Sequence, residues 1–111
     1  MTDLARQHPA PDGTAPALTD EQAREKLRLL TGWSMENGKI SRDVKLKNFK
    51  QALALVNRIG ELAEQENHHP DISIHSWNHV RLELYTHTVQ GLSDNDFIMA
   101  ARFDELLASS Q

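Results

Sequence analysis

The chain is short, mildly acidic and free of cysteine. Its 111 residues carry a formal net charge of −4, with 39% hydrophobic and 25% charged residues, as expected for one globular domain. A negative balance gives no general attraction to nucleic acid or anionic membranes, and no apolar run approaches the roughly 20 residues of a membrane span. The absence of cysteine excludes disulfides, thiolate zinc sites and a cysteine nucleophile. We therefore expect neither a nucleic-acid nor a membrane partner.

The first 17 residues have the composition of a flexible tail. Three prolines and one glycine fall within the first 16 residues, which is too little apolar material to build a core. The segment also lacks the continuous apolar stretch of a secretory signal and the basic character of an organellar presequence. We therefore expect a cytoplasmic protein whose single folded domain occupies residues 18–111.

The first predicted elements are a helix and a hairpin. Thr19 is a good N-cap, Gln22 stands at the capping-box position, and Gly32 marks the expected end of the helix. A hairpin is predicted over residues 33–46, with its turn at Asn37-Gly38, the preferred two-residue pair. Apolar residues alternate on one face of its second strand: Ile40, Val44 and Leu46.

The second predicted helix begins after Asn48, which is a favourable N-cap. An apolar stripe follows at helical spacing: Phe49, Ala52, Leu53, Val56, Ile59 and Ala63. The helix must end before Pro70, because the residue before a proline is driven out of the α region. His68 and His69 are therefore expected at the C-terminal end of this helix or just beyond it.

Two further strands and a helix complete the predicted fold. Ile72 and Ile74 belong to a short strand, and residues 78–87 alternate as a longer one with even-numbered residues in the core. Ser93 caps the last helix, with Asp96 as a capping-box variant. The apolar side of this helix comprises Phe97, Ala100, Ala101, Leu106 and Leu107. The order α-β-β-α-β-β-α predicts an α+β fold, a four-stranded antiparallel sheet with helices packed on one face.

Five of the six histidines lie between Glu64 and Asp96, which suggests proton transfer, metal binding or both. A pair such as His68-His69 is ordinarily a surface feature of a helix end, where cations are favoured. Pro70 changes this balance, because it fixes where the backbone leaves the helix and where both imidazoles point. By strand parity, His87 projects from the polar face of the sheet.

Metal binding is a secondary alternative. Zinc sites need three or four converging ligands, and His75 and His79 have the H-x-x-x-H spacing in a strand-and-turn stretch rather than on a helix. We interpret these two as ordinary surface residues and assign no metal. The helix start at residues 91–96 is most simply a cap, although free N–H groups there can also bind a carbonyl oxygen or an anion.

Several motifs together resemble the pterin-4a-carbinolamine dehydratase family. They comprise Glu64, His68-His69-Pro70-Asp71, Asn78-x-Val80, Thr86-His87 and Gly91-Leu92-Ser93 with Asp96, and upstream Gly32-Trp33 and Lys47-Asn48-Phe49 followed by Ala52. The resemblance covers roughly residues 19–108 in the family's own element order. The connection from Pro70 to Asn78 is one residue longer than in animal-type members and is similar to the bacterial and plant types.

The resemblance implies dehydration of 4a-hydroxytetrahydropterin to quinonoid dihydropterin, in tetrahydropterin recycling after an aromatic amino acid hydroxylase. This needs acid–base catalysis and no cofactor. It further implies a catalytic set of His68, His69 and His87, in which His68 and His87 are the acid–base candidates and His69 mainly binds and orients the pterin. Supporting roles in binding fall to these residues: Glu64, Pro70, Thr86 and Asp96.

Other roles on the same fold stay open at this point. Relatives include a dimerisation partner of a homeodomain transcription factor and a Rubisco assembly factor, so the alternative is a non-catalytic binding or assembly protein. The assembly-factor type tends to lose the histidine motif, which this chain keeps. Family members are dimers or tetramers, so the resemblance also implies a homodimer or homotetramer.

Overall fold

The computed structural model describes residues 3–11 and 14–110, and it confirms the predicted α+β fold with three helices and four strands in the expected order. Two short 3₁₀ helices, η1 and η2, are additional. The elements are η1 (Asp3–Arg6), α1 (Asp20–Leu27), β1 (Ser34–Glu36), β2 (Lys39–Lys45), α2 (Phe49–Glu66), β3 (Asp71–His75), β4 (His79–Leu84), η2 (His87–Val89) and α3 (Asp94–Ser110).

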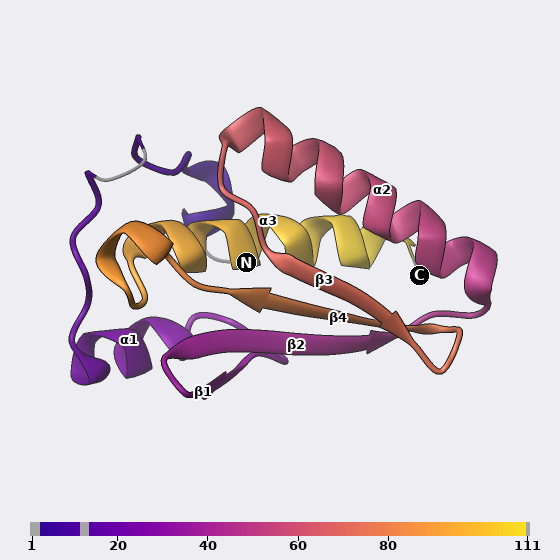
Figure 1. Ribbon diagram of the computed structural model, residues 1–111, viewed down its shortest axis with the longest axis horizontal. Helices are drawn as coiled ribbons and strands as arrows, with labels where there is room; N and C mark the ends of the chain where they lie inside the picture. The colour runs from indigo at the N-terminus through magenta and orange to yellow at the C-terminus, as the bar shows by residue number, and fades with distance from the viewer. Residues whose placement is uncertain (1–2, 12–13, 111) are drawn as a thin grey trace.

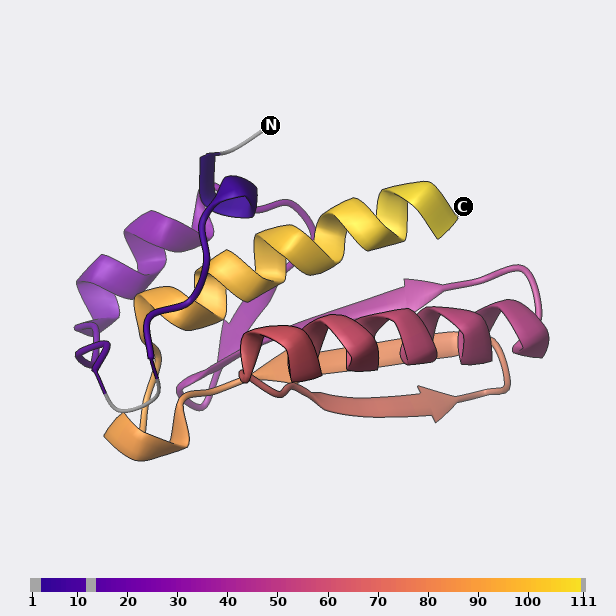
Figure 2. The same ribbon diagram turned by 90° about the horizontal axis from the view of Figure 1, so that it is seen from above.

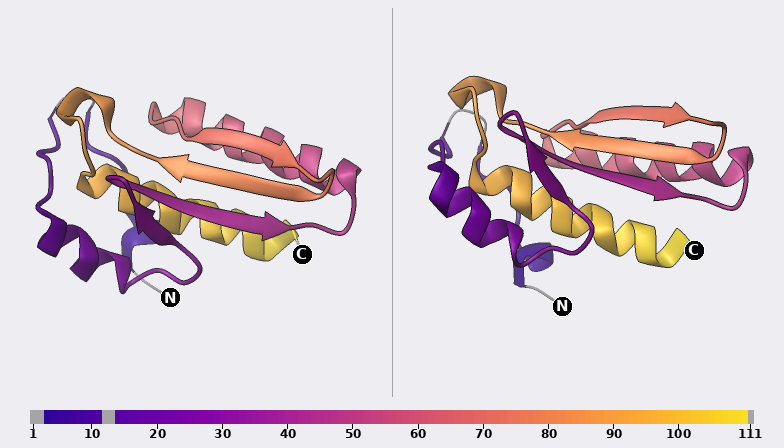
Figure 3. Two further views of the ribbon diagram at one scale, coloured as in Figure 1. Left: turned by 60° about the horizontal axis from the view of Figure 1, so that its bottom comes forward. Right: turned by 90° about the horizontal axis from the view of Figure 1, so that it is seen from below.

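The strands form one antiparallel sheet in the order β1-β2-β4-β3. Helices α2 and α3 lie side by side across one face of this sheet, whereas α1 lies near its β1 end (Figures 1 and 2). The opposite face carries no helix in the described chain, as the views from below show (Figure 3). The predicted hairpin turn is confirmed, because Glu36 pairs with Lys39 across Asn37-Gly38.

The core fills the layer between the sheet and the two long helices. Strand β4 shows the predicted alternation, since Val80, Leu82 and Leu84 are fully buried and the residues between them are partly exposed. From α3, Phe97, Met99 and Phe103 are also fully buried. Because both long helices share this core with β2 and β4, the ends of α2, β4 and α3 are held in a fixed relation to one another.

The apolar stripe predicted on α2 is partly corrected. Ala52, Ile59 and Ala63 are buried as expected, but Leu55 is the fully buried residue of the second turn. Phe49 and Leu53, which the spacing assigned to the core, are 50% and 43% exposed. Successive helical residues turn by about 100° around the helix axis. The buried face of α2 therefore runs through Leu55 and leaves Phe49 and Leu53 at its exposed border.

Two element boundaries also differ from prediction. Helix α1 ends at Leu27, well before Gly32, because the chain tightens into turns in which Leu29 N–H donates to the Lys26 carbonyl. Strand β4 ends at Leu84 rather than at residue 87, and η2 follows. The parity argument that placed His87 on the polar face of the sheet therefore does not apply to it.

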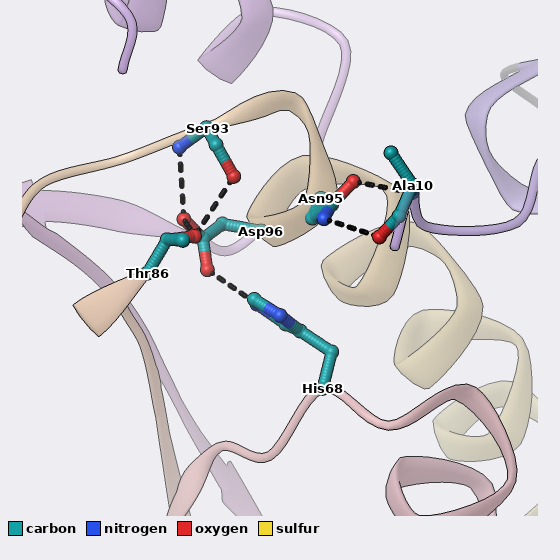
Figure 4. Close-up of polar contacts among 6 residues, drawn as sticks. All are labelled: Ala10, His68, Thr86, Ser93, Asn95 and Asp96. Atoms are coloured by element: carbon teal, nitrogen blue, oxygen red, sulfur yellow. Dashed lines mark hydrogen bonds and ion pairs between the residues drawn. The ribbon is translucent and has the colours of Figure 1, made fainter. Parts of the chain in front are cut away.

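The segment before α1 makes specific contacts with the domain. Leu4 is buried, and Asn95 of α3 exchanges two hydrogen bonds with the backbone of Ala10, at 2.8 and 3.0 Å (Figure 4). His8 Nδ1 lies 2.9 Å from a carboxylate oxygen of Glu66. The flexibility predicted for residues 1–17 concerns motion and stays a prediction; residues 1–2 and 12–13 of that segment lie outside the described residues. No helix among the described residues is long and apolar enough to cross a membrane.

Candidate active site

The histidine pair His68-His69 directly follows the C-terminal end of α2. Asn67 caps the helix in the left-handed conformation (φ 53°, ψ 42°), with its N–H bonded to the carbonyls of Ala63 and Glu64. His68 N–H also donates to Ala63, at 3.1 Å. This cap reverses the chain direction, so His68 and His69 lie between the helix and β3 as predicted.

His68 is tied to Asp96 of α3. The two side chains meet at 2.8 Å between His68 Nε2 and Asp96 Oδ1, and the exposed fractions are 10% for His68 and 0% for Asp96 (Figure 4). A carboxylate can only accept hydrogen bonds, so Nε2 carries the hydrogen and donates it. Nδ1 is then the nitrogen of a neutral His68 that can accept a proton. Asp96 thus selects the tautomer and the orientation of the ring.

The second oxygen of Asp96 is held by two donors. Thr86 Oγ1 donates at 2.7 Å and the backbone N–H of Ser93 donates at 3.0 Å. Because the hydroxyl hydrogen of Thr86 is directed at Asp96, the Ser93 hydroxyl must be the donor in its 2.8 Å contact with Thr86. All three residues are buried, and a buried polar network with every member satisfied is rigid.

The predicted capping box at the start of α3 is therefore half present. Asp96 accepts from the backbone of Ser93, as a capping-box residue should, but the Ser93 hydroxyl is directed at Thr86. Thr86 was expected to support binding of the ligand. Its N–H and carbonyl are instead bonded to Gly91, so its described contribution is the hydroxyl that supports Asp96.

A pocket of about 180 Å³ brings the three predicted catalytic histidines together. His68 and His69 enter it from the end of α2, and His87 enters from the start of η2. The ring of His87 meets the ring of Tyr85 edge-on, with centroids 4.9 Å apart. The full lining comprises Asn67, His68, His69, Tyr85, Thr86, His87 and Thr88.

The other predicted binding residues lie around this pocket rather than in its wall. Glu64 contacts His69 through Oε2 and Nε2, and both side chains are largely exposed. Pro70 and Asp96 do not line the pocket either, since Pro70 begins the run into β3 and Asp96 lies behind His68. Sequence reasoning gave no role to Tyr85 and missed the hydroxyl of Ser93. The Ser93 spacing signalled a cap, and nothing in it pointed to Thr86.

Two larger hollows, of about 320 and 360 Å³, have no histidine in their lining. The first contains Asp104, whose pKa is raised by burial although hydrogen bonds from Trp33 and Arg42 oppose the rise. A perturbed carboxyl can mark a functional site. Here, however, Trp33 Nε1 at 2.8 Å and Arg42 Nη1 at 2.9 Å both donate to Oδ1 of this carboxyl group, which ties it to structural partners. The smaller histidine-lined pocket is therefore the candidate active site.

The sequence of the chain matches a known protein family. The sequence pattern described as "Pterin 4 alpha carbinolamine dehydratase" matches residues 16–106. The chain belongs to the pterin-4a-carbinolamine dehydratase family. It is 38% identical over 94 residues to pterin-4-alpha-carbinolamine dehydratase 2, mitochondrial, of Arabidopsis thaliana, covering 81% of this chain and 50% of that protein. The chain therefore spans about half the length of this plant relative.

Bacterial relatives match over nearly their whole length. A protein of Methylococcus capsulatus, which carries the same dehydratase name in provisional form, is 42% identical over 96% of this chain and 94% of its own length. A solved structure entitled transcriptional coactivator/pterin dehydratase from Brucella melitensis superposes with a TM-score of 0.75 at 30% identity, covering 81% of this chain and 97% of that chain. The predictions of a dehydratase family and of a hydro-lyase class are confirmed at this level.

Proposed function

We propose that the protein is a 4a-hydroxytetrahydropterin dehydratase that uses histidine acid–base catalysis and no cofactor. The observation that carries the proposal is the pocket in which His68, His69 and His87 converge, with His68 held by buried Asp96. Membership of the dehydratase family and the names of the full-length bacterial relatives support the substrate class.

The reaction makes modest demands on a protein. The bond from C4a to the hydroxyl oxygen breaks while a C4a=N5 double bond forms, the N5 hydrogen leaves as a proton, and water departs. An acid must protonate the leaving hydroxyl and a base must accept the proton from N5. Positioned acid–base groups typically accelerate such a step by about 10²–10⁴-fold, and histidine can serve in either role near neutral pH.

The structure suggests how the roles are divided. His68 is nearly buried and held in one tautomer, so its Nδ1 is an oriented proton acceptor. His87 lies across the pocket on a different element and is the second acid–base candidate. His69, exposed and supported by Glu64, is placed to bind and orient the ring. Under this scheme Asp96 and Thr86 act through His68 and are positioning residues.

The wider setting follows from the same proposal. The product would be a quinonoid dihydropterin in tetrahydropterin recycling, which links this protein to an aromatic amino acid hydroxylase. We propose a cytoplasmic homodimer or homotetramer in this role. The binding or assembly alternative is not favoured, because the relatives that span the full chain are named as dehydratases.

Stopped-flow mixing with freshly generated 4a-hydroxytetrahydropterin tests the activity. The wild type should accelerate the decay of the carbinolamine absorbance, and His68→Ala combined with His87→Ala should remove about 10²-fold or more of that acceleration. The matched control is His8→Ala, which also removes a histidine bonded to a carboxylate but lies outside the pocket. Decay at the uncatalysed rate with the wild type, or full activity in the double variant, would overturn the proposal.

A further inference from the structure

A second group of histidines lies on the open face of the sheet, away from the pocket. His75 ends β3 and His79 begins β4, and the two are direct partners across the hairpin. Their rings are stacked, with centroids 5.1 Å apart and planes at 25°. The H-x-x-x-H spacing, read on a strand-and-turn stretch, therefore brings two imidazoles into contact just as it does on a helix.

A carboxylate from a third strand joins this pair. Asp43 of β2 accepts from His79 Nδ1 at 2.9 Å through Oδ1, and its Oδ2 lies 2.5 Å from His75 Nε2. One oxygen thus faces each imidazole. An ordinary surface ion pair joins one histidine to one carboxylate. Here two stacked imidazole rings contact the carboxylate of Asp43.

The three strands are locked together beside this cluster. Asn78, which directly precedes His79, is buried and donates from its side-chain amide to the Leu46 carbonyl at 3.0 Å. Leu46 N–H in turn donates to the Asn78 carbonyl at 2.7 Å. These two bonds join the β3–β4 hairpin to the end of β2, so the distance from Asp43 to both histidines is set by backbone contacts.

The electrostatic surroundings leave the cluster open to a cation. Arg81 is the register partner of Asp43, but its guanidinium is directed at Ser41 and Glu83, each at 3.3 Å. The side chains of Asp43, His75 and His79 are 35%, 47% and 31% exposed. With neutral imidazoles, the three side chains carry one negative charge and face solvent. Lys45, the register partner of His79, is a positively charged residue two positions after Asp43 on β2.

We propose that Asp43, His75 and His79 form a binding site for a divalent transition-metal ion such as zinc. One ligand atom from each residue lies within 4.8 Å of the other two. Zinc with ligands at about 2.0–2.2 Å in tetrahedral geometry needs separations of about 3.4 Å, which side-chain rotation can reach. Two imidazoles and one carboxylate suit zinc and other first-row transition metals. Calcium and magnesium prefer ligand sets made of oxygen atoms alone, so these ions should bind more weakly.

The ion would take the place of the hydrogens that now lie between the imidazoles and the carboxylate. On binding, the one hydrogen of each neutral imidazole moves to the other ring nitrogen, and this change of tautomer needs no net loss of protons. Three protein ligands leave a fourth position for water or an exchangeable ligand, as in open zinc sites.

Titration of the untagged protein with Zn²⁺, followed by calorimetry and by ¹⁵N–¹H spectra, tests the site. We expect one equivalent to bind, with chemical-shift changes centred on residues 43–45 and 73–81. His75→Ala with His79→Ala should weaken this binding about tenfold or more, and so should Asp43→Asn. His8→Ala, which removes a histidine–carboxylate contact outside this cluster, should leave it unchanged.

Three results would overturn the proposal. They are absence of stoichiometric Zn²⁺ binding, unchanged affinity in the double histidine variant, and shift changes confined to the pocket around His68, His69 and His87. Because the shifts report location and the circular dichroism of each variant reports folding, a misfolded variant cannot be mistaken for a lost ligand.

Discussion

Asp96 combines three tasks that are commonly divided among several residues. Its carboxylate bonds the start of α3 through Ser93 N–H, accepts the Thr86 hydroxyl and holds His68, all while fully buried. Removing any one partner would leave a charged group in the interior with an unmet hydrogen bond, which is costly. The identity of residue 96 is thus constrained by stability as well as by chemistry.

Thr86→Val tests this at the level of one hydrogen bond. The substitution keeps the shape of the side chain but removes the donor to Asp96, so the free energy of unfolding should fall by about 1–3 kcal/mol. Thr88→Val is the matched control, because Thr88 is exposed in η2, two residues further on, and its loss should change stability by less than about 0.5 kcal/mol. Urea unfolding measures both. Equal stabilities of the two variants would contradict the role assigned to Thr86.

At the scale of elements, the pocket exists because three element ends meet. The C-terminal end of α2 supplies His68 and His69, the residues after β4 supply Thr86 and His87, and the start of α3 supplies Asp96. The backbone conformation at each element end therefore sets the positions of the pocket side chains. The long regular parts of the helices and strands keep these ends adjacent.

The left-handed cap at Asn67 gives the sharpest element-scale prediction. A residue with a Cβ is strained at φ 53°, and asparagine tolerates this conformation better than alanine. Asn67→Ala should therefore lower the free energy of unfolding by about 1 kcal/mol, whereas Asn67→Gly should be close to neutral. Thermal or urea unfolding of the two variants gives the comparison. A destabilisation of the same size in both would mean that the asparagine side chain, rather than the backbone conformation, is what matters.

The segment before α1 should respond to acid through Glu66. A hydrogen bond from His8 lowers the pKa of Glu66; burial raises it to a lesser extent, and Arg102 lowers it further. A carboxyl with a lowered folded-state pKa contributes stability above its usual pKa of 4.5 and loses that contribution as the pH falls through the lowered value. Heteronuclear NOE values for residues 4–10 should therefore fall as the pH is reduced below 4.5. In Glu66→Gln the NOE values should not change over this range, and a parallel change in both proteins would refute the assignment.

At the scale of the whole molecule, the sequence predicted the order and pairing of the elements because local signals were strong. Thr19 with Gln22, Asn37-Gly38, Asn48 and the alternation along β4 each specify one local structure, and each is found. What could not be predicted depends on contacts distant in sequence. Asp43 is 32 residues from His75, and Thr86 is 10 residues from Asp96. The spacing of apolar residues along the sequence does not predict such side-chain contacts. The choice of Leu55 over Leu53 for the core likewise depends on how α2 is rotated against the sheet.

The histidine pocket, with His68, His69 and His87, and the cluster of Asp43, His75 and His79 lie at opposite ends of β3. His69 precedes the strand and His75 ends it, which separates them by roughly 20 Å of extended chain. Groups this far apart, with no shared partner, behave independently. The His75→Ala, His79→Ala variant should therefore keep the full dehydration rate, and His68→Ala should keep the Zn²⁺ affinity. Stopped-flow and calorimetry on both variants would reveal any coupling, which would contradict the division into two sites.

The burial of Asp96 and Ser93 also bears on how the protein would fail when heated. Both lie at the very start of α3, yet both are fully covered, so this helix end cannot fray while the core is intact. A partly heated sample should then consist of fully competent molecules and inactive unfolded ones, with few in between. The catalytic rate would then be proportional to the fraction of folded molecules. Its decrease with temperature should follow the unfolding curve measured by circular dichroism.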